Sequence, residues 1–409
     1  MPTLSEDLAF RGLIHQVTDA ELPKRLDQPG LTVYAGFDPS SDSLHVGNLL
    51  QLCTLRRFQD AGHSVISLAG GGTGMIGDPG GKQDERRLLD LATIERYLEG
   101  IRPQLAQFLD LDRVLLLNNA DWLSTLSTLE YLRDVGKHFT VNQMVAKESV
   151  KSRFERPDHG ISYTEFSYML LQAYDFLRLH VDHGCDVQLG GSDQWGNITM
   201  GIDLVRRLRR AEVFGLTSPL LLQSDGTKFG KTESGTVWLD AERTSPFRLY
   251  QFFLRAEDAD VGSYLRYFTF LDHDEIAALD EATATRPERR DAQRALAVAV
   301  TTLVHGEQET AGAEAASAAL YTEAISSLDE GTLLEVCAEA PSSTLPRSVL
   351  DGGYSLVEAL AASGLTGSKT QARTTVTQGG AYLNNQRVDD AEARIGRGDL
   401  LFDRYALLR

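Results

Sequence analysis

The chain has 409 residues, which is long for one average domain, so two or three domains are expected. Its 42% apolar and 24% charged residues are ordinary for a soluble globular protein, and its net charge of −18 argues against a chain that coats nucleic acid or anionic membrane with its whole surface. Three scattered cysteines, an N-terminus without an apolar signal segment, and no run of about 18 apolar residues predict a cytoplasmic protein with no membrane span and no disulfide framework.

Strand and helix patterns alternate through the first half of the chain. The β-branched, apolar run Leu31–Phe37 predicts a buried strand, and the helix-periodic segment 44–62 that follows it stops at Gly62. Further strands are predicted at residues 63–71, within 111–122, at the start of 185–208 and at Leu216–Gln223. Further helices are predicted at Ser127–Leu132, Val141–Val150, Thr164–Leu179 and the end of 185–208.

This alternation predicts an α/β fold in which helices cover both faces of a Rossmann-like parallel sheet. Ligands of such sheets bind beyond the carboxyl ends of the strands, at the point where the strand order reverses. Polar residues fall at these predicted ends, namely Tyr34, Asp38, Thr73, Asp78, Asp193 and Gln194.

The sequence changes character after about residue 240. We therefore expect a Rossmann-like catalytic domain at residues 1–240 and, because Ala, Leu and Glu dominate after it, an α-helical domain at 241–339. Pro, Ser and Gly concentrate in 340–354, which indicates a linker. Residues 355–409 combine helix, turn and short-strand patterns, with Asn384 and Asn385 at the bend of a hairpin, and are expected to form a small C-terminal α+β domain.

The stretch "YAGFDPSSDSLHVGN" joins the first predicted strand to its helix. A helix that starts there presents unpaired N–H groups and the positive end of its dipole, which favour a bound anion, most often phosphate. His45 and Asn48 are three residues apart, so they share a helix face and can both donate hydrogen bonds, and Ser40 can cap the helix or donate. The alternative is an ordinary helix cap with an incidental surface histidine.

Two further segments place glycine beside basic residues. "GGGTGMIGDPGGKQDERR" carries Asp78, Lys82 and Arg86, yet it matches neither the dinucleotide-binding nor the Walker pattern. "TKFGKT" carries Lys228 and Lys231, which are point charges on long stems and suit phosphates. Surface loops are the alternative for both segments. Together with the lack of a nucleophile–base pair or a metal-ligand cluster, these residues predict a nucleoside triphosphate held by positioning and charge.

The helix-periodic "SYMLLQAYD" carries a polar stripe. Tyr168, Gln172 and Asp175 are spaced by four and three residues, so they lie on one helix face. The stripe is either the exposed side of an amphipathic helix or a set of buried groups that recognise a ligand.

These segments resemble the two signatures of the class I aminoacyl-tRNA synthetases, because "FDPSSDSLHVGN" is similar to the HIGH signature and "KFGKT" to the KMSKS signature. The intervening "GDPGGK", "RDVGKHFTVNQMVAKESV", "TEFSYMLLQAYDF" and "GGSDQWGNI" resemble the bacterial tyrosyl-tRNA synthetases. The resemblance covers essentially the whole chain, and motifs of this length in this order are highly specific.

The resemblance implies a role for each site residue. The phenolic hydroxyl of a tyrosine substrate would be bound by Tyr34 and Asp175, and its ammonium group by Asp78, Tyr168 and Gln172. The adenosine and tyrosyl side would be lined by Gly36, Asp38, Gly191, Asp193 and Gln194. The phosphates of ATP would meet Ser40, His45 and Asn48, and the leaving pyrophosphate would be covered by Lys82, Arg86, Lys228 and Lys231.

Two places depart from the family pattern. Asn48 stands where the HIGH signature ends in histidine, and because an amide N–H can replace an imidazole N–H as donor, activity is expected to survive. In the KMSKS-like segment Gly230 replaces the central serine and Thr232 the last one, while both lysines remain.

Binding of tRNA requires local positive charge. Candidate contacts are Lys147, Lys151 and Arg153, Arg206 and Arg207, and, in the C-terminal domain, Lys369 and Arg373. The alternative for each group is a solvated helix face. The C-terminal domain resembles a small RNA-binding domain shared with a ribosomal protein, and with seven basic against six acidic residues in 355–409 it carries a net charge of +1.

The resemblance implies a tyrosine–tRNA ligase that uses ATP, L-tyrosine and tRNA(Tyr), works as a homodimer, and takes Mg²⁺ with ATP rather than at a metal site of the protein. The alternatives are a related class I synthetase for another aromatic amino acid, a nucleotidyltransferase, or a non-catalytic RNA-binding protein derived from a synthetase.

Overall fold

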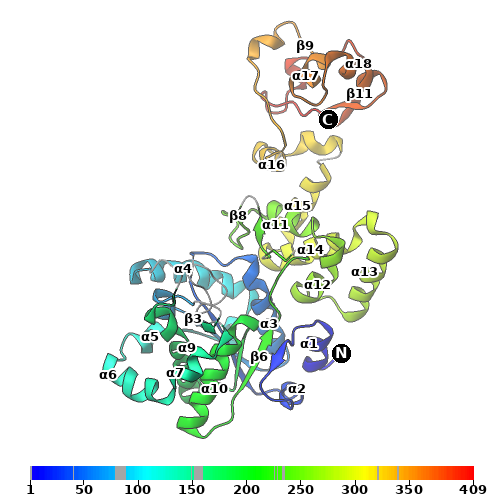
Figure 1. The fold of residues 1–409 in the computed structure, drawn as a ribbon. Coiled ribbons are helices and arrows are strands. Elements are labelled where there is room, and N and C mark those ends of the chain that lie inside the picture. Colours follow the sequence, from blue (N-terminus) through cyan, green and yellow to red (C-terminus); the bar gives the residue numbers. More distant parts are fainter. Residues whose placement is uncertain are drawn as a thin grey trace. The chain divides into compact units, whose positions relative to one another are not determined.

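The computed structural model describes residues 2–39, 41–78, 89–148, 150–151, 160–224, 226–227, 229–232, 235–319, 322–338 and 340–409. The chain forms two compact units, the first of residues 1–245 and 252–304 and the second of residues 246–251 and 305–409. Figure 1 shows the helices and strands of both units in the order of the sequence.

A six-stranded sheet forms the centre of the first unit, in the order β1-β6-β5-β2-β3-β4. The strands are β1 Gln16–Val17, β2 Thr32–Phe37, β3 Ser64–Ala69, β4 Val114–Asn118, β5 Val187–Gly191 and β6 Phe214–Ser218. All neighbours pair in parallel except β1, which pairs antiparallel with β6. The mostly parallel sheet confirms the expected fold class. The order reverses between β2 and β5, so the carboxyl ends of these two strands flank the crevice at which such sheets bind ligands.

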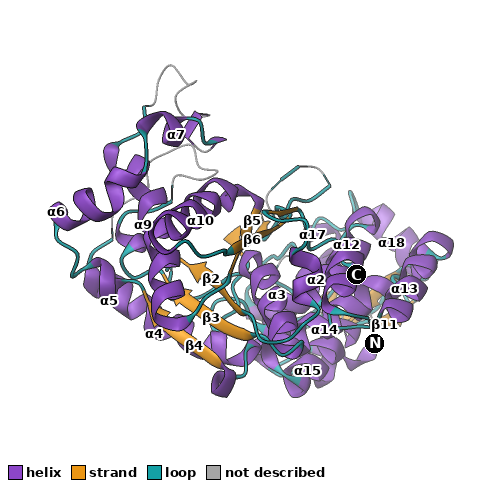
Figure 2. Cartoon of the chain, turned by 90° about the horizontal axis from the view of Figure 1, so that it is seen from below, coloured by secondary structure: helices purple, strands orange, loops and turns teal. Residues whose placement is uncertain are grey.

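Helices lie on both faces of this sheet (Figure 2). On one face α3, Leu49–Asp60, packs against β2, β3 and β5. On the other face α9, Tyr163–His183, packs along α10, Trp195–Arg209, which contacts β5 and β6. The first unit also contains α1 Leu4–Phe10, α2 Leu22–Leu26, α4 Leu91–Phe108, α5 Ala120–Leu123, α6 Thr128–Glu130, α7 Val141–Val145, α12 Asp258–Phe268, α13 His273–Thr285, nearly all of α14 Asp291–His305, and the hairpin of β7 Lys231–Thr232 and β8 Gly235–Thr236.

The core beneath α9 and α10 explains why β2 and β3 are so apolar. Tyr34 of β2 and Leu68 of β3 are buried together with Phe176 of α9 and Met200 of α10. Because β2 lies inside the sheet and both of its faces are covered, its side chains are apolar at nearly every position.

The sequence-based prediction of a strand at Leu216–Gln223 is wrong at both ends, because β6 runs from Phe214 to Ser218. Pro219 has no amide hydrogen and cannot continue the ladder of a central strand. The apolar residues after it therefore leave the sheet. The short edge strand β1 and the helices α1 and α4 were not predicted from the sequence at all.

The second unit contains α15 Glu307–Ala319, α16 Glu330–Val336 and most of α11 Pro246–Leu254, followed by β9 Tyr354–Ser355, α17 Leu356–Ala362, α18 Lys369–Thr377, β10 Ala381–Leu383, β11 Gln386–Val388 and β12 Arg394–Ile395. Leu360 of α17 and Val376 of α18 are buried in its small C-terminal core. Asn384 and Asn385 have φ angles of 50° and 62° between β10 and β11, so the predicted hairpin bend is confirmed. Among the described residues, no helix has the length and apolar character needed to cross a bilayer.

Candidate active site

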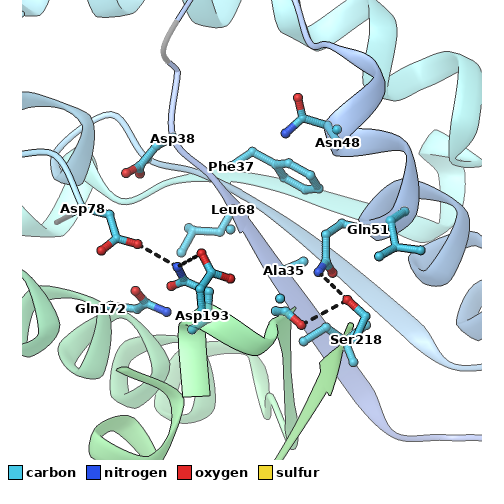
Figure 3. A pocket seen from close by; sticks show the side chains of 18 of the residues that line it. Ala35, Phe37, Asp38, Asn48, Gln51, Leu68, Asp78, Gln172, Asp193 and Ser218 are labelled. Atoms are coloured by element: carbon cyan, nitrogen blue, oxygen red, sulfur yellow. Dashed lines mark hydrogen bonds between the residues drawn. The ribbon is translucent and has the colours of Figure 1, made fainter. Parts of the chain in front are cut away.

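A cavity of about 510 Å³ opens at the carboxyl ends of β2 and β5, where the strand order reverses (Figure 3). Its lining includes thirteen of the residues singled out from the sequence, namely Tyr34, Gly36, Asp38, His45, Asn48, Thr73, Asp78, Tyr168, Gln172, Asp175, Gly191, Asp193 and Gln194. These residues are spread over 160 positions of the chain. Parallel pairing of β2 with β3 and β5 brings them to one edge of the sheet.

The turn before α3 fixes the orientation of His45 and Asn48. The backbone N–H of Gly47 donates to His45 Nδ1 at 3.0 Å, and the backbone N–H of His45 donates to Asn48 Oδ1 at 3.0 Å. Because Nδ1 accepts a hydrogen bond, a neutral imidazole carries its hydrogen on Nε2. In the same way the amide oxygen of Asn48 faces the turn and its NH₂ group is the donor left for a ligand.

Asp175 of α9 is 2% exposed and its carboxylate is held by two donors. Asn119 Nδ2 donates to Oδ2 at 2.9 Å, and Trp122 Nε1 donates to Oδ1 at 2.7 Å. Burial raises the pKa of the Asp175 carboxyl to about 7, although these two hydrogen bonds favour the ionised form. The carboxyl is therefore poised between its two protonation states near neutral pH.

The hydroxyl of Tyr34 is buried and has no hydrogen-bond partner among the described residues. Burial and the nearby Asp175 carboxylate raise the pKa of Tyr34 well above its usual range, so the hydroxyl stays protonated. A buried hydroxyl without a partner is costly, and such groups in native proteins call for an explanation. Because Tyr34 and Asp175 both line the cavity, a polar group of a ligand can supply the missing partner.

Tyr168 joins the stripe on α9 to the end of β2. Its hydroxyl donates to Asp38 Oδ2 at 2.8 Å, while Thr73 Oγ1 donates to Asp38 Oδ1 at 2.8 Å. Burial and the carboxylates of Asp38 and Asp78 raise the pKa of Tyr168 well above its usual range. The tyrosine therefore remains a neutral donor that orients a carboxylate at the cavity wall.

Asp78 and Asp193 form an acidic corner of the cavity (Figure 3), and hydrogen-bonded side-chain amides hold it in place. Gln194 Nε2 donates to Asp78 Oδ2 at 2.6 Å and approaches Asp193 Oδ2 at 3.4 Å. Asn197 Nδ2 in turn donates to Gln172 Oε1 at 2.9 Å and to Gln194 Oε1 at 3.2 Å. Asn197 therefore fixes both glutamines, and the carboxylates of Asp78 and Asp193 face the same amide. This corner favours a cationic or hydrogen-bond-donating group.

Several predicted residues lie outside what the structure describes. Ser40, Lys82, Arg86, Lys228 and Arg153 fall in undescribed positions, and the side chains of Lys231 and Thr232 are likewise not described. Of the KMSKS-like segment, Phe229 lines the cavity.

The basic residues proposed for tRNA mostly have acidic or backbone partners. Lys147 is half-buried, and its Nζ donates to Thr199 Oγ1 at 2.8 Å, whereas Lys151 is exposed. Arg206 pairs with Asp203 at 2.6 Å, and Arg207 donates to the carbonyl of His138 at 2.7 Å. In the second unit the ion pairs are Lys369 with Glu358 and Arg373 with Glu392. All of these pairs are at least partly exposed, so they are weak enough to exchange for phosphate.

Sequence reasoning missed the residues that hold the site residues in place. Asn119 and Trp122 follow β4, Asn197 lies in α10, and Gln51 of α3 donates to Ser218 Oγ at 3.1 Å in the cavity wall. Asn119 could have been predicted as a site residue, because it is a polar residue at the carboxyl end of a predicted strand. Within the described ranges, no three His, Cys, Asp or Glu side chains gather so as to hold a metal ion.

The sequence matches two family models. Residues 27–322 match the model described as tRNA synthetases class I (W and Y), and residues 335–409 match the tyrosine–tRNA ligase SYY-like C-terminal domain.

Full-length relatives and a solved structure agree with these matches. The tyrosine–tRNA ligase of Roseiflexus castenholzii is 52% identical over 100% of this chain and 97% of its own, and that of Opitutus terrae is 51% identical over the same shares. The C-terminally truncated mitochondrial tyrosyl-tRNA synthetase of Aspergillus nidulans is 34% identical, with a TM-score of 0.69 over 78% of this chain and 95% of that one.

Proposed function

The chain belongs to the tyrosine–tRNA ligases among the class I tRNA synthetases, and from this membership we propose how its residues divide the reaction. It activates L-tyrosine with ATP and transfers the tyrosyl group to the terminal adenosine of tRNA(Tyr). The alternatives, a synthetase for another aromatic amino acid, a nucleotidyltransferase or a non-catalytic RNA-binding protein, are not favoured, because about half of all residues are identical to named ligases over their full length.

The chemistry needs no covalent bond to the protein. A carboxylate oxygen of tyrosine attacks the α-phosphorus of ATP, the new O–P bond forms, and the bond to the bridging oxygen of pyrophosphate breaks. A ribose hydroxyl of the tRNA then attacks the carbonyl carbon of tyrosyl-adenylate, and AMP leaves. The side chains therefore act by binding, orientation and stabilisation of charge.

The phenol of the substrate takes the place of the missing partner of Tyr34. In our proposal the substrate hydroxyl donates to the Asp175 carboxylate and accepts from the Tyr34 hydroxyl. Asn119 and Trp122 keep the carboxylate aimed at the phenol. Phenylalanine would leave both buried groups unpaired, so the slot discriminates against it. The unpartnered hydroxyl of Tyr34 beside Asp175 is the single observation that carries this assignment.

The acidic corner of the cavity binds the ammonium group. We assign this group to Asp78, Tyr168 and Gln172, because Gln194 and Asn197 hold two of these side chains in place. A carboxylate within contact of an ammonium group forms a charge-assisted hydrogen bond.

ATP binds across the ends of β2 and β5. We assign its adenosine side to Gly36, Asp38, Gly191, Asp193 and Gln194, and its phosphates to Ser40, His45 and Asn48. The leaving pyrophosphate is covered by Lys82, Arg86, Lys228, Lys231 and Thr232. Mg²⁺ enters with the phosphates of ATP and neutralises part of their charge.

The tRNA contacts and the assembly complete the proposal. We assign tRNA binding to the C-terminal domain, residues 355–409, joined through 340–354 to a helical domain at 241–339 and a catalytic domain at 1–240. Leu129, Val141 and Tyr163 are 79%, 63% and 69% exposed, and a contiguous patch of large apolar side chains would mark an interaction surface. We propose that a second copy of the chain covers them in a homodimer, and that the enzyme acts in the cytoplasm.

Exchange of labelled pyrophosphate into ATP, measured with each of the twenty amino acids, tests the function. Exchange is expected with tyrosine and at a far lower rate with phenylalanine. Equal exchange without tyrosine, or a preference for another amino acid, would refute the phenol slot. Sedimentation of the wild type beside a Val141→Lys variant tests the homodimer, which should dissociate on substitution.

A further inference from the structure

Phe229 lies in a polar segment between two lysines, yet it is only 8% exposed. Its ring stacks on Phe268 with centroids 5.2 Å apart and planes 21° apart, and it lies 4.8 Å from the ring of Tyr264 and 5.3 Å from that of Phe252. Aromatic pairs at these separations attract each other beyond the gain from burial alone. Phe229 is therefore anchored in a cluster of rings, which we call the ring cluster: Phe229, Phe252, Tyr264 and Phe268.

The next residue, Gly230, lies against the turn that contains His45. Its φ angle is +81°, and a Cβ atom at this position would lie 2.5 Å from Cγ2 of Val46. Both the backbone conformation and the close approach require glycine. The KMSKS-like segment thus contacts the HIGH-like turn directly through its backbone.

The chain after the β7–β8 hairpin returns to the same turn. The N–H of Val237 donates to the carbonyl of Gly230 at 3.1 Å, and the N–H of Val46 donates to the carbonyl of Val237 at 3.0 Å. The N–H of Leu239 donates to the carbonyl of Leu44 at 2.9 Å. The hairpin is therefore fixed to the turn at both of its ends.

The ring cluster itself is tied to the helix that follows the turn. Tyr264 and Phe268 belong to α12, and Arg57 of α3 donates to the carbonyl of Thr269, the C-cap of α12, at 2.5 Å. Arg11 donates to the same carbonyl at 3.0 Å. Both arginines are buried, and such cations complement the negative end of a helix dipole. α3 thus connects the HIGH-like turn, which precedes it, with α12, which carries Tyr264 and Phe268 of the ring cluster.

We propose that Phe229 is a positioning residue that fixes the KMSKS-like segment against the His45–Asn48 turn, and that this anchor is required for the proposed action of Lys228 and Lys231 on the phosphates of ATP. The inference rests on the proposed role of the two lysines. Phe229 acts through its neighbours, because a phenyl ring can neither neutralise the charge of a phosphate nor transfer a proton.

Loss of a positioning residue is expected to lower kcat and to leave the KM for tyrosine nearly unchanged. Loss of the ring in Phe229→Ala is expected to lower kcat for tyrosine-dependent pyrophosphate exchange by about 100-fold, the loss expected when reacting groups shift by about 1 Å. The KM for tyrosine should stay within about twofold, because the residues assigned to tyrosine lie on β2, on α9 and, for Asp78, in the segment after β3, and not on this segment. Phe229→Leu, which keeps an apolar anchor, should recover at least about tenfold of the lost rate.

Phe108→Ala is the matched control, because Phe108 of α4 is also a buried phenylalanine, 1% exposed, but lies outside the cavity and the ring cluster. It should lose stability without losing kcat. As a readout independent of activity, trypsin should cleave after Lys228 or Lys231 at least about tenfold faster in Phe229→Ala than in the wild type, with no such change in Phe108→Ala. If Phe229→Ala does not fold, the same two measurements on Phe229→Leu against wild type decide, with smaller shifts of the same sign.

The two possible failures are distinguishable. A wild type that shows no tyrosine-dependent exchange overturns the proposed function, and the trypsin rates then still test the anchor. A wild type that exchanges normally, with Phe229 variants of unchanged kcat or unchanged trypsin cleavage, overturns the positioning role alone. The role is equally overturned if Phe108→Ala loses kcat by the same factor.

Discussion

In the proposed complex Asp175 accepts the phenol of tyrosine, and its pKa of about 7 predicts that tyrosine binding is sensitive to pH in the physiological range. In this proposal the carboxyl has to be ionised to accept the phenol while its two protein donors, Asn119 and Trp122, remain in place. Below pH 7 the free enzyme holds a proton that tyrosine binding has to release. We therefore expect the affinity for tyrosine to fall as pH decreases and to be constant above about pH 8.

The size of the effect follows from a single ionisation. One unit below the pKa, about nine in ten molecules are protonated, so the apparent Kd for tyrosine at pH 6 should be about tenfold higher than at pH 8, or about 1.4 kcal/mol. The phenol group of free tyrosine titrates at about pH 10, and its ammonium group is essentially fully protonated at about pH 6, so neither contributes to the rise in Kd on the acid side.

Calorimetric titration with L-tyrosine from pH 5.5 to 8.5, in two buffers of different ionisation enthalpy, measures the Kd and the protons released. Close to one proton should be released at pH 6 and almost none at pH 8.5. Asp175→Asn is the control, with weaker binding that does not change with pH. A wild-type Kd that is flat across this range, or a pH dependence that persists in Asp175→Asn, would refute the assignment of the phenol to this carboxyl.

Four further substitutions or conditions follow from the same geometry. Tyr34→Phe removes a buried hydroxyl without a described partner, so the free enzyme should gain about 1 kcal/mol in urea unfolding while tyrosine binds roughly tenfold more weakly; a stability loss would show that the hydroxyl is paired. Because the folded pKa of Asp175 lies above its unfolded value of 3.8, its contribution to stability is fully present below about pH 4 and is lost as pH rises through about 7. Relative to Asp175→Asn, the wild type should therefore lose about 4 kcal/mol of unfolding free energy between pH 4 and pH 8, and parallel curves would contradict this. Arg57→Met removes one of the two buried arginines that donate to the Thr269 carbonyl at the end of α12 and should lower the unfolding free energy by about 3 kcal/mol, whereas a loss under about 1 kcal/mol would mean that Arg11 suffices. A chain ending at residue 339 should keep pyrophosphate exchange, because every lining residue of the cavity lies between 34 and 229, but it should no longer charge tRNA; full charging would remove the C-terminal domain from the tRNA contacts.

If ATP binds in this cavity as proposed, the charge of the cavity requires cations from elsewhere in the chain. Asp38, Asp78, Asp175 and Asp193 all line it, and these carboxylates favour the ammonium group of tyrosine. The same field opposes the phosphates of ATP. Basic side chains on glycine-bearing segments, together with Mg²⁺ carried by ATP, fit this need.

Local sequence patterns determined the elements that position the site. The period of the helix placed Tyr168, Gln172 and Asp175 on one face of α9, and alternation of strands with helices predicted a parallel sheet with polar residues at its carboxyl edge. The Asn384–Asn385 bend followed from the tolerance of asparagine for positive φ. These features depend on contacts between residues close in sequence, which is why one sequence reveals them.

Only the tertiary structure decided which groups hold the site together. Asn119 and Asp175 are 56 positions apart, and Arg11 reaches the carbonyl of Thr269 over 258 positions, so no local pattern links them. From the sequence Phe229 resembles a surface residue between two lysines, but in the fold Tyr264 and Phe268 of α12 pack against its ring. Burial and pairing of this kind depend on packing between distant segments, and their energies arise only when the whole fold has formed.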